Sequence, residues 1–248
     1  AASLLGEMAN TNENVREHLI SFLGAGAYNH YIPSVVDHIL RRGEFYTAYT
    51  PYQPEISQGT LQAIFEYQSL MTNLTGMEVS NASHYDGATA TAEAVNLAFA
   101  QFRGKRKKVV LSPSLHPQYR EVIRTYTQGM GVEEVGDDVS IDPEVGPEAM
   151  MSLVDENTML VVVQYPDFFG RIHDYTKLIE DAHAKGALVC IVANPTALLM
   201  LKTPAEMGAD IVVGEAQPFG IPLWYGGPYL GFFTTKKSYV HKMAGRLV

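Results

Sequence analysis

Leu188-Val189-Cys190-Ile191-Val192 is an apolar run with no charged or amide side chain in it, and Met159-Leu160-Val161-Val162-Val163 is a second. Short apolar runs without alternation are typical of strands that are buried on both faces, as in parallel sheets. Between these two runs, a helix is predicted over 175–185. Buried strands that alternate with helices indicate a doubly wound α/β domain with helices on both faces of the sheet.

The same alternation extends toward both ends of the chain. Apolar residues recur at i, i+3, i+4 and i+7 over 57–74, which predicts an amphipathic helix that Gly76 ends. We therefore expect a large α/β domain with a mostly parallel mixed sheet over 57–248, preceded at 1–56 by an N-terminal arm and interface loop. Further strands are predicted at 77–80, 109–112, 131–135, 211–213 and 230–233, and further helices at 35–42, 88–102, 117–128 and 147–153.

Composition excludes several classes of protein. With 248 residues, 46% of them hydrophobic and 18% charged, the chain can bury a sizeable core. A net charge of −9 argues against a nucleic-acid or anionic-membrane partner. Cys190 is the single cysteine, so neither an intrachain disulfide nor a metal site is expected, and Cys190 is predicted to be a core residue. No run is long enough to span a membrane and no signal peptide is visible, which predicts a cytoplasmic protein.

Four local motifs are candidates for function. The turn at Asp86-Gly87 opens a helix, so it is either an anion cradle or an ordinary helix cap. His116 follows a predicted strand, at the edge where α/β sheets bind ligands, but a capping role is equally open. The segment 46–59 holds three tyrosines and two prolines, which suits an interface or pocket lip, or else a packed connector. In 214–228, Glu215 is the only strong acid or base, and this loop is interpreted as positioned rather than reactive.

These segments together resemble the P-protein family of the glycine cleavage system, in the α subunit (subunit 1) of its two-subunit bacterial form. The likeness covers essentially the whole chain. The matching runs are 21–26 (SFLGAG), 30–36 (HYIPSVV), 45–59 (FYTAYTPYQPEISQG), 85–90 (YDGATA), 219–222 (FGIP) and 225–228 (YGGP).

The resemblance implies a type I fold of the enzymes that depend on pyridoxal 5'-phosphate (PLP), with this chain as the large domain. The family's small C-terminal domain is missing from these residues, so we expect the chain to be a fragment of a longer one. Family members assemble as α2β2, in which a lysine of the β subunit (subunit 2) holds PLP. Glycine loses its carboxyl group as CO2, and the aminomethyl group passes to the lipoyl arm of the H-protein.

This chain departs from the family's catalytic pattern at two positions. Gln217 stands at the position of the Schiff-base lysine, and an amide cannot form an imine with PLP. Asn194 follows the strand that should end in the aspartate partner of the cofactor ring. We therefore expect no catalytic residue and no covalently bound PLP in this chain, which would instead complete the active site of its partner. Candidates for contact with that site are Tyr49, Tyr52, Gln53 and Glu55, and candidates for a vestigial cofactor site are Asp86, Gly87, His116 and Gln217.

Two alternatives remain open. The chain could be a stand-alone PLP enzyme that uses an atypical lysine, although Lys202, Lys236 and Lys237 are interpreted as surface residues. It could also be a structural or regulatory paralogue with no role in turnover.

Overall fold

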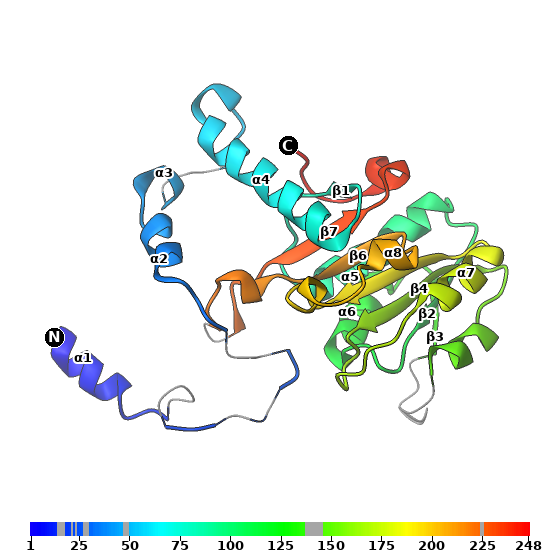
Figure 1. Ribbon diagram of the computed structural model, residues 1–248, viewed down its shortest axis with the longest axis horizontal. Coiled ribbons are helices and arrows are strands. Elements are labelled where there is room, and N and C mark those ends of the chain that lie inside the picture. Colours follow the sequence, from blue (N-terminus) through cyan, green and yellow to red (C-terminus); the bar gives the residue numbers. More distant parts are fainter. Residues whose placement is uncertain are drawn as a thin grey trace. The chain divides into compact units, whose positions relative to one another are not determined.

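The computed structural model describes residues 1–13, 18–20, 22, 24–26, 30–46, 50–136, 146–223 and 226–248. They fall into two compact units, Ala1–His30 and Tyr31–Val248 (Figure 1). The first unit contains helix α1 (Ala2–Ala9), which buries none of its residues. The second contains the sheet and the candidate site. The predicted domain boundary after residue 56 lies inside the second unit, and it stays a prediction.

The second unit is built on one sheet with seven strands among the described residues, in the order β1-β7-β6-β5-β4-β2-β3. The strands from β2 to β6 pair in parallel, while β7 lies antiparallel between β6 and β1. The predicted doubly wound, mostly parallel mixed sheet is therefore confirmed. The strands are β1 (Val79–Ser80), β2 (Lys108–Leu111), β3 (Glu133–Val135), β4 (Thr158–Tyr165), β5 (Leu188–Ala193), β6 (Ile211–Glu215) and β7 (Gly231–Thr235).

The central strands are apolar because both of their faces are covered. Side chains alternate between the two faces of a strand, so Val161 and Val163 join one core cluster, while Leu160 and Val162 join the other. Cys190 on β5 is fully buried in the second cluster, which confirms its prediction as a core residue. Burial raises the pKa of its thiol, so the neutral form is favoured.

Helices cover both faces of the sheet (Figure 1). The predicted helix over 57–74 is present as α4, and it ends at Gly76, whose positive φ of 75° suits a glycine. The segment predicted as a helix over 147–153 is a 3₁₀ helix instead, at Pro147–Ser152. The remaining helices are α2 (Ser34–Leu40), α3 (Gly43–Tyr46), α4 (Gln58–Thr75), α5 (Gly87–Gln101), α6 (Pro117–Thr127), α7 (Thr176–Ala184) and α8 (Pro204–Met207).

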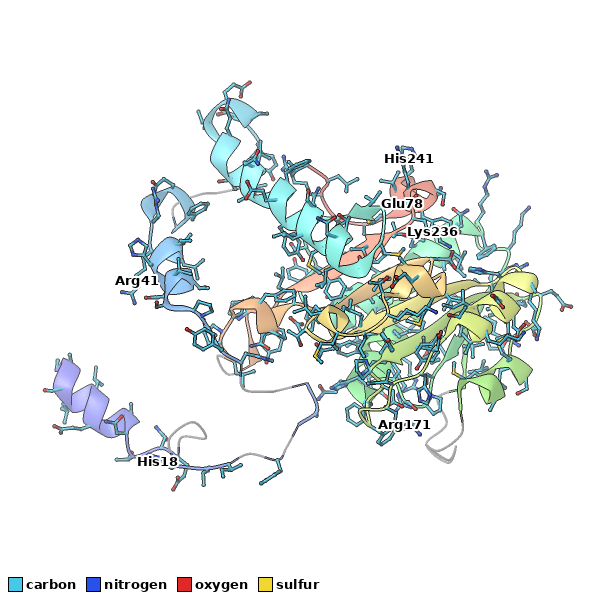
Figure 2. The ribbon with its side chains drawn as sticks, in the orientation of Figure 1. His18, Arg41, Glu78, Arg171, Lys236 and His241 are labelled. Carbon is cyan, nitrogen blue, oxygen red and sulfur yellow. The ribbon has the colours of Figure 1, made fainter. Side chains whose placement is uncertain are left out.

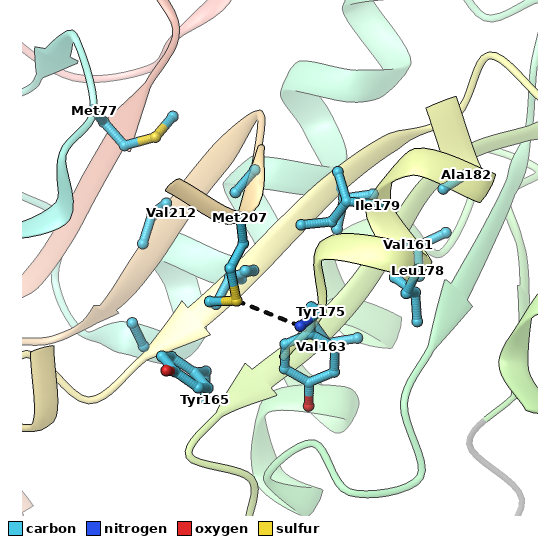
Figure 3. Packing of buried hydrophobic residues seen from close by; sticks show 14 of the residues in the cluster. Met77, Val161, Val163, Tyr165, Tyr175, Leu178, Ile179, Ala182, Met207 and Val212 are labelled. Atoms are coloured by element: carbon cyan, nitrogen blue, oxygen red, sulfur yellow. Dashed lines mark hydrogen bonds between the residues drawn. The ribbon is translucent and has the colours of Figure 1, made fainter. Parts of the chain in front are cut away.

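The core under α7 and α8 is shown in Figure 3, where Leu178 and Ile179 of α7 pack over β4. There the backbone N–H of Tyr175 donates to the sulfur of Met207 at 3.4 Å (Figure 3). Within the described ranges, no helix is both long enough and apolar enough to cross a membrane.

Candidate functional site

The candidate site lies where β6 ends and α5 begins, and Glu215 joins the two elements. Its Oε2 accepts a hydrogen bond from the Gly87 backbone N–H at 3.0 Å. Its Oε1 accepts from the N–H groups of Gln217 and Leu230, at 2.9 and 3.0 Å. The half-buried carboxylate of Glu215 therefore links the first residue of a helix with two loop residues.

Asp86 is the N-cap of α5. The Thr89 N–H donates to Asp86 Oδ1 at 2.7 Å, and the Asp86 N–H donates to Thr89 Oγ1 at 3.1 Å, which together form a capping box. Of the two interpretations of the Asp86-Gly87 turn, the helix cap therefore applies to Asp86. Carboxylates at a helix N-terminus are stabilising because they match unpaired N–H groups and the helix dipole.

Two glycines let the amino end of α5 approach the sheet closely. A Cβ on Gly231 would lie 2.2 Å from the carbonyl oxygen of Asp86. A Cβ on Gly87 would lie 2.3 Å from the Tyr119 hydroxyl and 3.0 Å from the backbone nitrogen of Glu215. Real Cβ atoms keep about 3.0 Å or more, so no larger residue fits at either position without a shift of its neighbours.

Burial dominates the electrostatics of this cluster. It raises the pKa of Glu215, while the hydrogen bonds from Leu230, Gly87 and Gln217 act in the opposite direction. Burial also raises the pKa of the Tyr119 hydroxyl, and the nearby charges of Glu215 and Asp86 raise it further. Tyr119 therefore stays neutral at physiological pH.

His116 connects to this cluster through Tyr119. The two rings stack with centroids 4.9 Å apart, and His116 Nδ1 accepts from the Gln118 N–H at 3.1 Å as the N-cap of α6. The His116 backbone N–H donates to Gln164 Oε1 at 2.8 Å. The sequence motifs did not single out Tyr119, although its place three residues after His116 on a predicted helix was a usable signal.

Gln217 and Asn194 both turn their side chains to local backbone groups. Gln217 is only 2% exposed, and its amide donates to the Ile221 carbonyl. Asn194 Oδ1 accepts from the N–H and the hydroxyl of Thr196, at 3.0 and 2.7 Å. These residues do not fit PLP: Gln217 offers no amine, Asn194 no carboxylate, and Glu215 places a negative charge at the helix end that a phosphate would need.

The lysines considered as substitutes have partners of their own, and Lys236 is labelled in Figure 2. Lys236 is not a freely solvated residue, because its Nζ is 2.6 Å from Oδ1 of Asp210, which is buried just before β6. That position is the amino end of the parallel strands, opposite to Gln217. Lys202 Nζ is 3.1 Å from Asp174 Oδ2 on the surface, and the Lys237 N–H donates to the Glu78 carboxylate.

The candidates for contact with a partner form a separate group. Tyr52, Gln53 and Glu55 are exposed just before α4, and Tyr52 is 73% exposed. Tyr49 lies outside the described residues. An open groove on α4 adjoins the group and includes Glu55 and Phe65.

Another polar cluster follows β4 but has a structural role. Buried Asp167 accepts from the Nε of Arg171 at 2.7 Å, and Arg171 also donates to Ser114 Oγ at 2.8 Å (Figure 2). These bonds fix the loop after β4. In the ranges that the structure covers, no group of three or more histidine, cysteine, aspartate or glutamate side chains is arranged to hold a metal ion.

Comparison with known proteins agrees with this fold. The family model described as "Glycine cleavage system P-protein" matches residues 2–248. "Probable glycine dehydrogenase (decarboxylating) subunit 1" of Desulforamulus reducens is 54% identical over 99% of this chain and 54% of its own length. The protein of the same description from Geobacillus kaustophilus is 53% identical over 98% of this chain and 54% of its own length. The chain thus spans about half the length of these relatives.

Solved structures give the same result. A crystal structure of glycine decarboxylase (P-protein) of the glycine cleavage system, in inhibitor-bound form, matches with a TM-score of 0.87 and 43% identity. The match covers 99% of this chain and 54% of that one. A NifS-like protein shares the fold alone, at 14% identity and a TM-score of 0.64 over 86% of this chain and 58% of its own. On this evidence the chain belongs to the P-protein family of the glycine cleavage system.

Proposed function

We propose that this chain is part of the non-catalytic subunit of a glycine decarboxylase and completes the active site of a PLP-bearing partner. The observation that carries the proposal is Gln217: in a chain that resembles a P-protein along its whole length, a buried amide bonded to the Ile221 carbonyl stands where the cofactor lysine is expected. The partner would be the lysine-bearing subunit 2, in a cytoplasmic α2β2 assembly. Glycine and the lipoylated H-protein would be its substrates.

The arrangement of lysines supports this division of roles. Lys236 is committed to buried Asp210 at the opposite edge of the sheet, and Lys202 to Asp174 on the surface. Lys236 therefore lies at the other end of β6 from Gln217, and both lysines have a carboxylate partner. A stand-alone PLP enzyme with an atypical lysine is therefore the weaker hypothesis.

The segment around Tyr52 supports a contact with the partner. Tyr52 is 73% exposed, Ile56 81% and Phe65 52%, so large apolar side chains face outward both in α4 and just before it. Exposed apolar patches often mark interaction sites. We propose that Tyr49, Tyr52, Gln53 and Glu55 reach the partner's active site from this segment.

The test is the exchange of labelled bicarbonate into the carboxyl group of glycine, with PLP and lipoylated H-protein present. The full-length gene product that contains this chain is assayed alone, the lysine-bearing subunit alone, and then both together. We expect exchange only in the mixture. Exchange by this gene product alone would show that it has its own catalytic lysine, and full exchange by the partner alone would leave this chain a structural or regulatory role.

The contact segment is tested in the same mixture. We expect Tyr52→Phe and Gln53→Ala to lower turnover or raise the KM for glycine. Tyr126→Phe and Gln128→Ala, in and just after α6, are matched controls that should change neither value. Unchanged kinetics in both contact variants would refute the role of this segment, and would leave the subunit assignment intact.

A further inference from the structure

The amino end of α5 has the backbone features that phosphate sites use. A helix N-terminus presents unpaired N–H groups and a positive dipole end, and phosphates bind at such ends in many proteins. In this chain, side-chain carboxylates accept those N–H groups in place of a phosphate. The Gly87 N–H donates to Glu215 Oε2 at 3.0 Å, and the Thr89 N–H donates to Asp86 Oδ1 at 2.7 Å.

Glu215 is fixed in this place by hydrogen bonds from three separate backbone groups. Gly87 binds one of its oxygens, and Gln217 and Leu230 bind the other. A carboxylate only accepts hydrogen bonds, so three N–H donors match it well. A phosphate group of a bound ligand would need the same three N–H donors.

The backbone next to Glu215 is closely packed at two glycines. A Cβ at Gly87 would already lie 2.3 Å from the Tyr119 hydroxyl and 3.0 Å from the Glu215 nitrogen. At Gly231, it would lie 2.2 Å from the Asp86 carbonyl oxygen. These contacts show that the amino end of α5 packs closely against β6 and β7, at the point where Glu215 accepts the Gly87 N–H.

We infer that Glu215 is a built-in anion that occupies the phosphate position at the amino end of α5. This position therefore excludes PLP and other phosphate monoesters because the carboxylate occupies it, and not only because Gln217 replaces a lysine. This inference deepens the proposed function and rests on it, because it explains why the cofactor would be confined to the partner subunit.

The experiment measures the thermal midpoint of the full-length gene product against inorganic phosphate, with chloride at matched ionic strength as reference. Wild type is compared with Glu215→Ala, which opens the space, and with Glu215→Gln, which keeps it filled. Glu206→Ala is the matched control, because Glu206 also accepts a backbone N–H at a helix N-terminus, at 2.8 Å from Thr203, but on the surface. No partner, glycine or PLP is present.

We expect Glu215→Ala to start below wild type and to gain a saturable rise in the presence of phosphate. In a protein about twice as long as this chain, a ligand at about ten times its Kd raises the midpoint by roughly 1–3 °C. Wild type, Glu215→Gln and Glu206→Ala should show only the small, unsaturated rise that phosphate gives to any protein. If Glu215→Ala is unfolded without phosphate, phosphate should restore its folding transition.

Three outcomes would overturn the inference. Wild type could show a saturable rise of its own, which would mean that the position is open. Glu215→Ala could respond no more than Glu206→Ala, which would mean adventitious ion binding only. Glu215→Ala could also stay unfolded at every phosphate concentration, which would mean that a phosphate does not fit there. Bicarbonate exchange in the two-subunit mixture is measured separately, so that failure of the proposed function is distinguished from failure of this inference.

Discussion

Gly231→Ala tests whether the close approach of β7 to the amino end of α5 is essential. The added methyl group would lie 2.2 Å from the Asp86 carbonyl oxygen and 2.6 Å from its carbon, both of them backbone atoms. The two segments would have to separate by about 0.8 Å to reach the 3.0 Å that real Cβ atoms keep. Overpacking of this kind costs about 1–3 kcal/mol, and a displaced Asp86 cap adds about 1 kcal/mol. We therefore expect a loss of roughly 2–4 kcal/mol.

The assay is thermal unfolding of the full-length gene product, followed by circular dichroism. The relatives of this chain are about twice as long as it is. In a protein of that length each kcal/mol lowers the midpoint by about 1–2 °C, so a fall of roughly 2–8 °C is expected. Gly59→Ala is the control, because Gly59 lies in α4 with nothing within 4 Å of its added Cβ. Gly59→Ala should raise the stability by about 0.5–1 kcal/mol. Equal midpoints for Gly231→Ala and wild type would refute the reasoning.

Asp210→Ala should lower the free energy of unfolding by about 2–4 kcal/mol, because it removes the carboxylate that Lys236 binds and leaves the buried Val189 N–H without its acceptor. Urea denaturation measures this free energy, and a change below about 0.5 kcal/mol would contradict the prediction. Since burial raises the pKa of Glu215, the native state binds its proton more tightly than the unfolded chain. The free energy of unfolding should therefore fall as the pH rises from the pKa of Glu215 in the unfolded chain through its higher pKa in the native state. Thermal midpoints recorded against pH measure this fall, and Glu215→Gln should abolish it. Asp174 should behave in the opposite way, because its hydrogen bonds to Thr176 and then Lys202 lower its pKa to about 2 from the usual 3.8. The stability that its carboxylate contributes is therefore lost as the pH falls from 3.8 to about 2. Asp174→Asn should remove this pH dependence of the thermal midpoint. Cys190 should not react with a thiol reagent in the native protein and should react fully in urea, since its thiol is buried and kept neutral; rapid native labelling would be evidence against that burial.

The fold follows from the sequence where local pattern and burial coincide. The apolar runs of β4 and β5 are buried on both faces, so composition alone marks them. The 3₁₀ helix Pro147–Ser152 differs from the α-helix that was predicted there, since six residues give an α-helix few internal bonds to complete. Helix α8 has only four residues and no periodicity to detect.

The candidate site was less accessible from sequence, because its central contact is not local. Glu215 and Gly87 are 128 positions apart, and nothing in either segment indicates that they meet. The sequence showed Glu215 only as the one strong acid or base in its loop. The contact between Tyr119 and α5 is also not local. The Tyr119 hydroxyl can lie against the backbone of Gly87 only because Gly87 has no Cβ.

Gln217 and Glu215 make different contributions to the proposed loss of cofactor binding. Gln217 removes a covalent bond but leaves a polar side chain that fits the same loop, where its amide donates to the Ile221 carbonyl. An empty anion position would leave the Gly87, Gln217 and Leu230 N–H groups unmatched in a half-buried place, and each unmatched group costs about 1–3 kcal/mol. Glu215 supplies the acceptors that these groups need. Under the proposed function, we therefore infer that the Glu215 carboxylate, more than the Gln217 amide, keeps the amino end of α5 stable without a bound phosphate.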